Sequence, residues 1–263
     1  MTASPSAPER TAAHNLLAGK TAVVTAAAGS GIGSATARRM VEEGARVVVS
    51  DHHERRLEAV HAELGEIPGA EVVSVPCDVT DEDQVTRLLD TAAVEFGGVD
   101  VLVNNAGLGG TASIQDMTDD QWNKVLDVTL NGTFRCTRAA VRRFRDQGGG
   151  GVVVNNASVV GWRAQAGQAH YAAAKAGVMA LTRCAAIDAA PLGVRINAVA
   201  PSLVMHANLA KVTSDELLGE LTSREAFGRS AEPWEVANVI VFLASGYSTY
   251  LTGEVVSVSN QHA

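Results

Sequence analysis

Cysteine is scarce in this sequence, and Cys77, Cys136 and Cys184 are its only three. Their spacing does not match that of a metal site, so we expect reduced thiols, no bound metal and a cytoplasmic protein. Long hydrophobic runs are also absent, and no stretch has the roughly 20 apolar residues that a membrane-spanning helix needs. Residues 1–15 lack the apolar core of a signal peptide, and we interpret them as a disordered N-terminal tail.

Basic residues are fewer than acidic ones, with 21 Lys and Arg against 29 Asp and Glu and a net charge of -8. This balance argues against a nucleic-acid surface and against a basic patch for a membrane, so we expect neither as a partner. The apolar share is 46 %, as in globular proteins, and the length of 263 residues suits one large domain, here residues 16–263.

Short apolar segments alternate with helical ones along nearly the whole chain. The segments of strand character are residues 21–25, 45–50, 71–77, 99–103, 152–154, 194–199 and 254–258. The helical segments are residues 34–43, 53–64, 82–96, 119–147 with an interruption expected near Gly132, an alanine-rich segment ending near Ala190, and 233–244. This alternation predicts an α/β fold, namely a single-domain, doubly wound, Rossmann-like parallel sheet of about seven strands with helices on both faces. Its ligand should lie beyond the carboxyl ends of the strands.

A glycine-rich turn follows the first expected strand. It runs through Thr25, three alanines, Gly29, Ser30, Gly31, Ile32 and Gly33. Glycines at this place let the backbone turn tightly and approach a pyrophosphate, which the N-terminus of the next helix attracts. Glycine also serves any tight turn, but its position between a strand and a helix favours dinucleotide binding.

Three residues that could transfer a proton lie at the end of the fifth expected strand and on the helix that follows it. Ser158 follows the strand, and Tyr171 and Lys175 lie four positions apart on the helix, where both project from one face. Taken singly, such residues are usually a turn serine and an amphipathic pair. Behind a glycine-loop fold, with Ser158 thirteen positions before Tyr171, they indicate a catalytic set.

Together with Asn104-Asn105-Ala106-Gly107 and residues 197–201, these motifs resemble those of the short-chain dehydrogenase/reductase family, over residues 16–258. The resemblance implies an NAD(P)-dependent enzyme that interconverts a secondary alcohol and a ketone. In that chemistry Tyr171 would carry the proton, and the positive charge of Lys175 would favour the tyrosine phenolate. Lys175 would also hold the nicotinamide ribose, and Ser158 would donate a hydrogen bond to the substrate oxygen.

Asp51 ends the second expected strand, where a carboxylate accepts hydrogen bonds from the adenosine ribose and repels a 2′-phosphate. It can also cap the helix that starts at His53, and both roles can hold together. The glycine loop has no Lys or Arg, so we predict NAD rather than NADP. The resemblance places further cofactor contacts at His52, Asp78, Val79, Asn105, Ala106, Gly107, Tyr171, Lys175, Pro201 and Val204.

Two of these contacts have alternative interpretations. Asp78 would hydrogen-bond the adenine amino group, but it can equally be a loop carboxylate that caps the next helix. Residues 104–107 are as much a structural motif of the sheet as a ligand contact.

The chain departs from the family's pattern at several positions. Ala26 stands where the first loop glycine is usual, so Gly29 is expected to take the tight turn. Thr129 stands where an Asn often supports a water relay to the lysine, and a Thr hydroxyl can still bind a water. Asn131 should face another side of the helix. Near the nicotinamide, Ser202 replaces a Gly and His206 a Thr.

The segment between Ser158 and Tyr171 should border the substrate, with Trp162, Arg163 and Gln168 as candidate contacts. Arg163 would meet an anionic group of the substrate or, alternatively, face solvent. Residues 202–230 are expected to form a lid, and their apolar side chains suggest a bulky, partly apolar substrate.

The amino-acid sequence of residues 50–57 and 161–165 is similar to that of actinobacterial family members that oxidise a ring hydroxyl on propanoyl-CoA steroid fragments. We therefore expect NAD-linked oxidation of a hydroxyl on a bulky acyl-CoA or steroid-derived substrate. One alternative is a 3-oxoacyl-[acyl-carrier-protein] reductase, which usually prefers NADP, so Asp51 argues against it. Another is a catalytically silent dinucleotide sensor, which would not need Ser158, Tyr171 or Lys175. Small-residue helix faces predict a homotetramer or homodimer.

Overall fold

The computed structural model describes residues 8–205, 219, 222–223 and 225–260 of the chain. Seven parallel strands form one sheet in the order β3-β2-β1-β4-β5-β6-β7. They are β1 (Thr21–Val24), β2 (Arg46–Asp51), β3 (Val72–Pro76), β4 (Val101–Asn104), β5 (Gly151–Asn156), β6 (Val194–Pro201) and β7 (Val255–Val258). The predicted doubly wound sheet is confirmed, because strand order reverses between β1 and β4.

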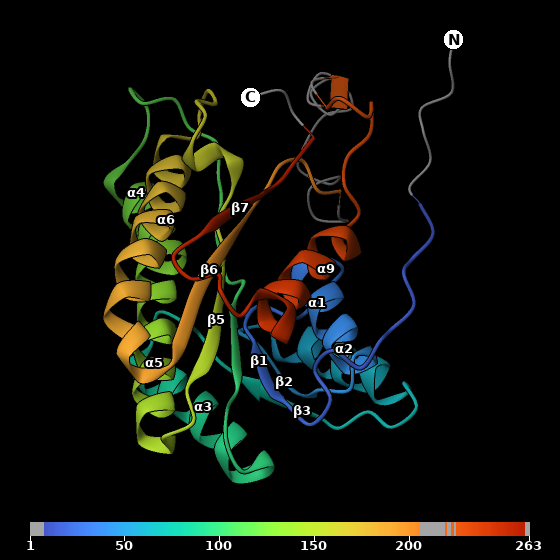
Figure 1. Cartoon of the computed structure of the whole chain (residues 1–263). Coiled ribbons are helices and arrows are strands. Elements are labelled where there is room, and N and C mark those ends of the chain that lie inside the picture. Colours follow the sequence, from blue (N-terminus) through green and yellow to red (C-terminus); the bar gives the residue numbers. More distant parts are fainter. Residues whose placement is uncertain (1–7, 206–218, 220–221, 224, 261–263) are drawn as a thin grey trace.

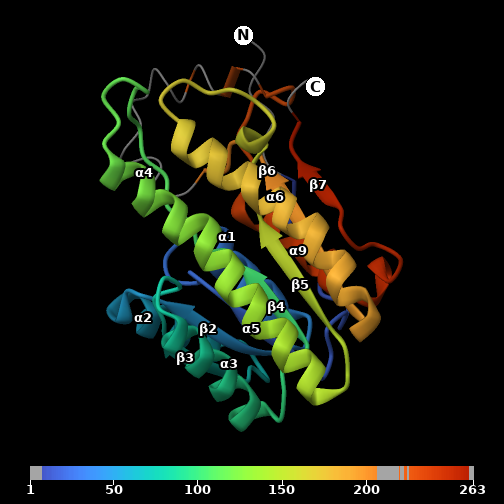
Figure 2. The same cartoon turned by 90° about the vertical axis from the view of Figure 1, so that its left-hand side faces the viewer.

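Helices cover both faces of the sheet (Figure 1). They are α1 (Ile32–Glu42), α2 (Glu54–Gly65), α3 (Glu82–Phe96), α4 (Asp119–Leu126), α5 (Gly132–Gln147), α6 (Ala169–Ala189) and α9 (Pro233–Ala244). Figure 2 shows α3, α5 and α6 in front of the sheet, with α1 and α9 behind it.

Successive residues of each central strand point to opposite faces, which is why the sheet is buried on both sides. Val24 and Val103 belong to the apolar cluster beneath α1 and α9. Val23 and Leu102 belong to the cluster beneath α3 and α5. The parallel register Val23↔Leu102 keeps these layers in line and brings the carboxyl ends of the strands to one edge.

The long helical segment expected at residues 119–147 is interrupted where the sequence predicted. A π-helical turn, Asp127–Asn131, separates α4 from α5. Gly132 begins α5 in close contact with the loop after β3, since a Cβ there would lie 2.6 Å from Val79 Cγ2. The turn carries Thr129, which is completely buried, toward the edge of the sheet where the strands end.

The described part of the N-terminal segment lies against α1. Arg39 Nη1 donates to the Thr11 carbonyl (2.5 Å), and Glu43 Oε2 accepts from the backbone N–H groups of His14 and Leu16 (both 2.9 Å). The Arg39 and Glu43 side chains pair at 2.5 Å and are buried. The expected domain boundary at residue 16 stays a prediction.

The expected lid at residues 202–230 is covered only in part, because residues 206–218, 220–221 and 224, with His206 among them, lie outside the described residues. Within the part of the chain that the structure describes, no helix has the length and hydropathy to cross a membrane.

Candidate active site

The glycine loop begins at Thr25, directly after β1, and is tied to the loop after β4. The Thr25 hydroxyl accepts from the backbone N–H groups of Asn105 (3.0 Å) and Ala106 (3.1 Å) and donates to the Val103 carbonyl (3.3 Å). Ala26 has φ of 49°, a left-handed conformation that L-residues other than Asn and Asp rarely adopt. Ala26 therefore takes the conformation for which glycine is usual, and Gly29 (φ 106°) is a second left-handed position in the same loop.

Helix α1 presents an open N-terminus to this loop. Its N-cap is Gly31, and no side chain there bonds the first N–H groups of the helix. At Gly33 a Cβ would meet the Ala26 carbonyl oxygen and lie 2.5 Å from Asn105 Nδ2. The N–H groups of a helix start and a glycine-lined approach fit the pyrophosphate of a dinucleotide, with Ser30 and Ile32 in the same turn.

Asp51 lies at the carboxyl end of β2 and is buried, with 6 % of its surface exposed. Its Oδ1 accepts from His53 N (2.9 Å), and its Oδ2 accepts from Ala28 N (3.3 Å) of the glycine loop. Burial raises the pKa of the carboxyl, while the nearby His52 and the Ala28 N–H act in the opposite direction. Asp51 thus links the start of α2 to the glycine loop, at the place expected of a ribose-binding carboxylate.

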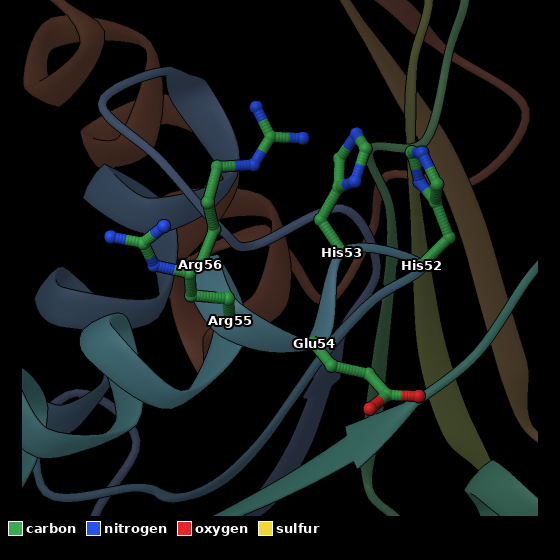
Figure 3. Close-up of a pocket in the computed structure, with 5 residues that line it drawn as sticks. All are labelled: His52, His53, Glu54, Arg55 and Arg56. Atoms are coloured by element: carbon green, nitrogen blue, oxygen red, sulfur yellow. The ribbon is translucent and has the colours of Figure 1, made fainter.

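A hollow of about 490 Å³ opens beside Asp51 (Figure 3), lined by His52, His53, Glu54, Arg55 and Arg56. The imidazoles of His52 and His53 lie side by side with ring centroids 3.8 Å apart, and Glu54 points away from them. His52 Nδ1 lies 3.3 Å from Asp51 Oδ1. The space is therefore bordered by imidazoles and guanidiniums next to a buried carboxylate.

Asp78 and Val79 follow β3, the edge strand that is separated from β1 by β2. The Asp78 carboxylate accepts from Thr80 N (2.9 Å) and the Thr80 hydroxyl (2.8 Å), while Asp81 caps α3. Val79 is buried against Gly132. These bonds describe the turn before α3, so a contact of Asp78 with adenine stays a prediction.

Ser158, Tyr171 and Lys175 come together beyond the end of β5. Ser158 follows the strand, and its Oγ accepts from Val160 N (3.3 Å). The Ser158 side chain lies close enough to Tyr171 to lower the pKa of the phenol. On α6, Lys175 Nζ lies 5.6 Å from the centroid of the Tyr171 ring and donates to the Asn156 carbonyl (2.5 Å). The spacing on one helix face therefore produces the expected constellation.

Burial shapes the protonation of these groups. Burial raises the pKa of Tyr171, and the nearby Ser158 hydroxyl lowers it in part. Burial lowers the pKa of Lys175 to about 8. A cation in this place would favour the phenolate of Tyr171.

Thr129 replaces the expected Asn and is bonded to the loop after β4. Its hydroxyl accepts from Leu108 N (3.0 Å) and donates to the Leu108 carbonyl (3.1 Å). A Cβ on Gly107 would lie 3.4 Å from Lys175 Nζ and 3.8 Å from Thr129 Oγ1, so Gly107 lies between them. Asn131 is exposed and donates to Asp127 (3.2 Å), so it faces away from the site as predicted.

Pro201 ends β6, and the chain continues past the site through Ser202 to Val204. Ser202 Oγ donates to Glu225 Oε2 (3.2 Å), and Leu203 N approaches Glu225 Oε1 (3.4 Å). Val204 is buried and pairs with Ala231 in an isolated bridge. The predicted nicotinamide-side segment is thus fixed partly by Glu225, a buried carboxylate that the sequence did not indicate.

The three candidate substrate residues lie on the loop between β5 and α6. Trp162 exposes 49 % of its surface. Gln168 Nε2 donates to Thr111 Oγ1 (3.3 Å), which joins this loop to the one after β4. Arg163 also interacts with another group of the protein, which does not decide between its two predicted roles.

Asn156 is a site residue that the sequence analysis missed. Its carbonyl holds Lys175, and its Nδ2 donates to Asn105 Oδ1 (2.9 Å). The available signal was an amide at the end of a valine-rich strand, where an apolar residue would suit the expected burial. Within the described residues, no group of three or more His, Cys, Asp or Glu side chains is placed to hold a metal ion.

Comparison with known proteins decides the family. The sequence profile of the family described as "Enoyl-(Acyl carrier protein) reductase" matches residues 26–260, nearly the whole chain. A crystal structure described as a short chain dehydrogenase from Mycobacterium smegmatis superimposes with a TM-score of 0.88 at 56 % identity, covering 98 % of this chain and 99 % of that one. The chain belongs to the short-chain dehydrogenase/reductase family. It is therefore an oxidoreductase that acts on hydroxyl and keto groups with a nicotinamide dinucleotide.

Two relatives within this short-chain dehydrogenase/reductase family bear on the reaction. A "(5R,7aS)-5-hydroxy-7a-methyl-1-oxo-2,3,5,6,7,7a-hexahydro-1H-indene-carboxyl-CoA reductase" of Mycobacterium tuberculosis is 64 % identical over 97 % of this chain and 98 % of its own length. A 3-oxoacyl-[acyl-carrier-protein] reductase of Thermotoga maritima is 38 % identical over 92 % of this chain and 97 % of its own. The predicted resemblance to steroid-ring CoA dehydrogenases is thus confirmed.

Proposed function

We propose that this enzyme uses NAD to interconvert a ring hydroxyl and a ketone on a bulky CoA thioester, with Tyr171 as the proton carrier. The observation that carries the proposal is the convergence of Ser158, Tyr171 and the buried Lys175 at the edge where β4 and β5 end. A dinucleotide sensor on the same fold would not need these three groups.

The oxidised cofactor, NAD⁺, would accept the hydride in alcohol oxidation, and the reduced cofactor, NADH, would donate it to the ketone in the reverse direction. Tyr171, as phenolate, would take the hydroxyl proton as the C–H hydride leaves, so the C–O bond gains carbonyl character. Lys175 would stabilise that phenolate and hold the nicotinamide ribose. Ser158, which lies beside Tyr171, would donate a hydrogen bond to the substrate oxygen and orient it.

Asp51 supports NAD rather than NADP. Its carboxylate is 6 % exposed, is fixed by two backbone N–H groups, and would repel a 2′-phosphate at the adenosine ribose. The neighbouring hollow is lined by Arg55 and Arg56, whose positive charges would attract a 2′-phosphate, and by Glu54, whose negative charge would oppose them. We infer that Asp51 decides the choice between NAD and NADP, because its carboxylate is the group that is fixed against the glycine loop.

The substrate class rests on the relative that is named for an indene-carboxyl-CoA. The ring system of such a thioester could pack on Trp162, which is half exposed on the loop between Ser158 and Tyr171. The acyl-carrier-protein alternative is supported by a relative of lower identity, and it is the second candidate.

A substrate panel tests this proposal. Initial rates would be measured with NAD and with NADP on hydroxyacyl-CoA and steroid-fragment thioesters, and in reverse on a 3-oxoacyl-carrier-protein. We expect NAD-linked turnover of the ring alcohols at a kcat/KM well above that with NADP. Preference for NADP and the acyl-carrier-protein would contradict the proposal and favour the alternative.

We also propose a homotetramer or homodimer. Large apolar side chains are exposed near the carboxyl ends of α6 and α9, namely Ile187, Phe242, Tyr247 and Tyr250. Exposed apolar side chains of this size favour association with a second copy of the chain. Light scattering at micromolar concentration tests it, and a monomer would contradict it.

A further inference from the structure

Two asparagines end β5, and they serve opposite faces of the sheet. Asn155 is completely buried on the face of α5 and α6, where it donates to Thr182 (2.9 Å) and accepts from Asn104 (2.8 Å). Asn156 points to the other face, as strand alternation requires. Its amide donates to Asn105 Oδ1 at 2.9 Å.

Asn105 extends this contact to the glycine loop. Its Nδ2 donates to the Ala26 carbonyl (3.0 Å), so two consecutive amide hydrogen bonds run from Asn156 to Ala26. Because Asn156 supplies a donor, the Asn105 amide is oriented with its oxygen toward β5 and its NH₂ toward the loop. Gly33 packs directly on this bond, since a Cβ there would lie 2.5 Å from Asn105 Nδ2.

Ala26 has a backbone conformation that needs support from neighbouring residues. Its φ of 49° is left-handed, where the Cβ of an alanine is crowded and a glycine would be free. Only surrounding contacts keep such a residue in place. The Asn105 amide is bonded to the carbonyl of that same residue.

We propose that Asn156 is a positioning residue for the dinucleotide: through Asn105 it holds the strained Ala26 and so keeps the glycine loop in its binding conformation. The Asn156 carbonyl meanwhile accepts from Lys175 Nζ (2.5 Å), so one residue contacts both Asn105 and the catalytic lysine. This inference rests on the proposed function, because it assigns a purpose to the loop as a dinucleotide site.

The test is a rescue experiment on the full-length enzyme. Asn156→Leu removes the donor at similar size, and Ala26→Gly removes the need for it. The Kd for NADH would be measured by fluorescence titration for the wild type, both single variants and the double variant, with thermal unfolding alongside. Asn155→Leu, alone and with Ala26→Gly, is the matched control on the opposite face.

Asn156→Leu should raise the Kd for NADH about 5- to 10-fold, the effect of losing one hydrogen bond. Adding Ala26→Gly should return the Kd to within about twofold of the Ala26→Gly variant, because glycine adopts the loop conformation unaided. Asn155→Leu should lower the unfolding temperature, with no recovery from Ala26→Gly.

An unchanged Kd in Asn156→Leu would overturn the inference, as would a double variant as weak as Asn156→Leu or equal rescue of Asn155→Leu. These outcomes leave the proposed function standing. Wild-type enzyme that binds neither NADH nor NADPH would instead overturn the proposed function, and this inference with it.

Discussion

At the scale of single residues, two glycines of the cofactor loop face very different surroundings. A Cβ on Gly33 would meet the Ala26 carbonyl oxygen and the Asn105 amide, whereas a Cβ on Gly31 would have no neighbour within 4 Å. Gly31 also has φ of -98°, which any residue can adopt. The two positions therefore form a matched pair.

We expect Gly33→Ala to lower the free energy of unfolding by about 1–3 kcal/mol, because backbone must shift to admit the methyl group. Gly31→Ala should stay within about 0.5 kcal/mol of the wild type. Urea unfolding followed by circular dichroism measures both. Equal stability of the two variants would show that the close approach at Gly33 is absent.

Lys175 gives a second prediction at this scale. Burial lowers its pKa to about 8, whereas an unfolded lysine titrates near 10.4. Between these values the unfolded chain binds more protons, so the free energy of unfolding should rise with pH, by up to about 1.4 kcal/mol per unit. Lys175→Met lacks this contribution.

Unfolding free energies of the cofactor-free wild type and Lys175→Met would be compared at intervals from pH 7 to 9.5. The wild type should gain on the variant above pH 8, since other titrating groups cancel in the difference. A difference that does not change with pH would contradict a lowered pKa for Lys175.

At the scale of elements, the carboxyl end of α1 binds the N-terminal segment. Burial alone raises the pKa of Glu43, but the Leu16 and His14 N–H groups and Arg39 outweigh it, so the net pKa is lowered. A carboxyl with a lowered pKa stabilises the fold above its unfolded pKa, and this stability is lost as the pH falls. Glu43 should therefore contribute at neutral pH and not in acid.

Glu43→Gln should cost about 1–3 kcal/mol of unfolding free energy at pH 7, and the cost should shrink below about pH 4. Glu42→Gln is the control, because Glu42 makes a part-exposed pair with Arg10 (3.1 Å) and should cost less than about 1 kcal/mol. Urea unfolding at both pH values measures this, and equal losses in the two variants would count against it.

The interruption between α4 and α5 was predictable from the sequence, but the contacts that it makes were not. Gly132 in a long helical stretch predicted a break, and the π-helical turn Asp127–Asn131 lies immediately before it. The sequence did not show that Thr129 would bond both backbone groups of Leu108. That contact depends on a loop 21 positions earlier, which local patterns do not specify.

At the scale of the whole molecule, the seven-stranded fold was predictable because each strand is a short apolar run that alternates with a helix. The convergence of Ser158, Tyr171 and Lys175 was predictable from one strand end and one helix face. The two amide hydrogen bonds from Asn156 through Asn105 to Ala26 were not predictable, since they join residues 51 and 79 positions apart. These bonds depend on how the carboxyl ends of β1, β4 and β5 are placed relative to one another in the folded sheet.

The central claim is that Tyr171 carries the proton, and one comparison tests it most directly. NAD-linked oxidation of a ring hydroxyacyl-CoA would be measured for the wild type and Tyr171→Phe, with NADH titrated into both. We expect kcat to fall roughly 10²- to 10⁴-fold while the Kd for NADH stays within a few-fold, because only the phenolic proton carrier is lost. Turnover of Tyr171→Phe close to that of the wild type would contradict the account.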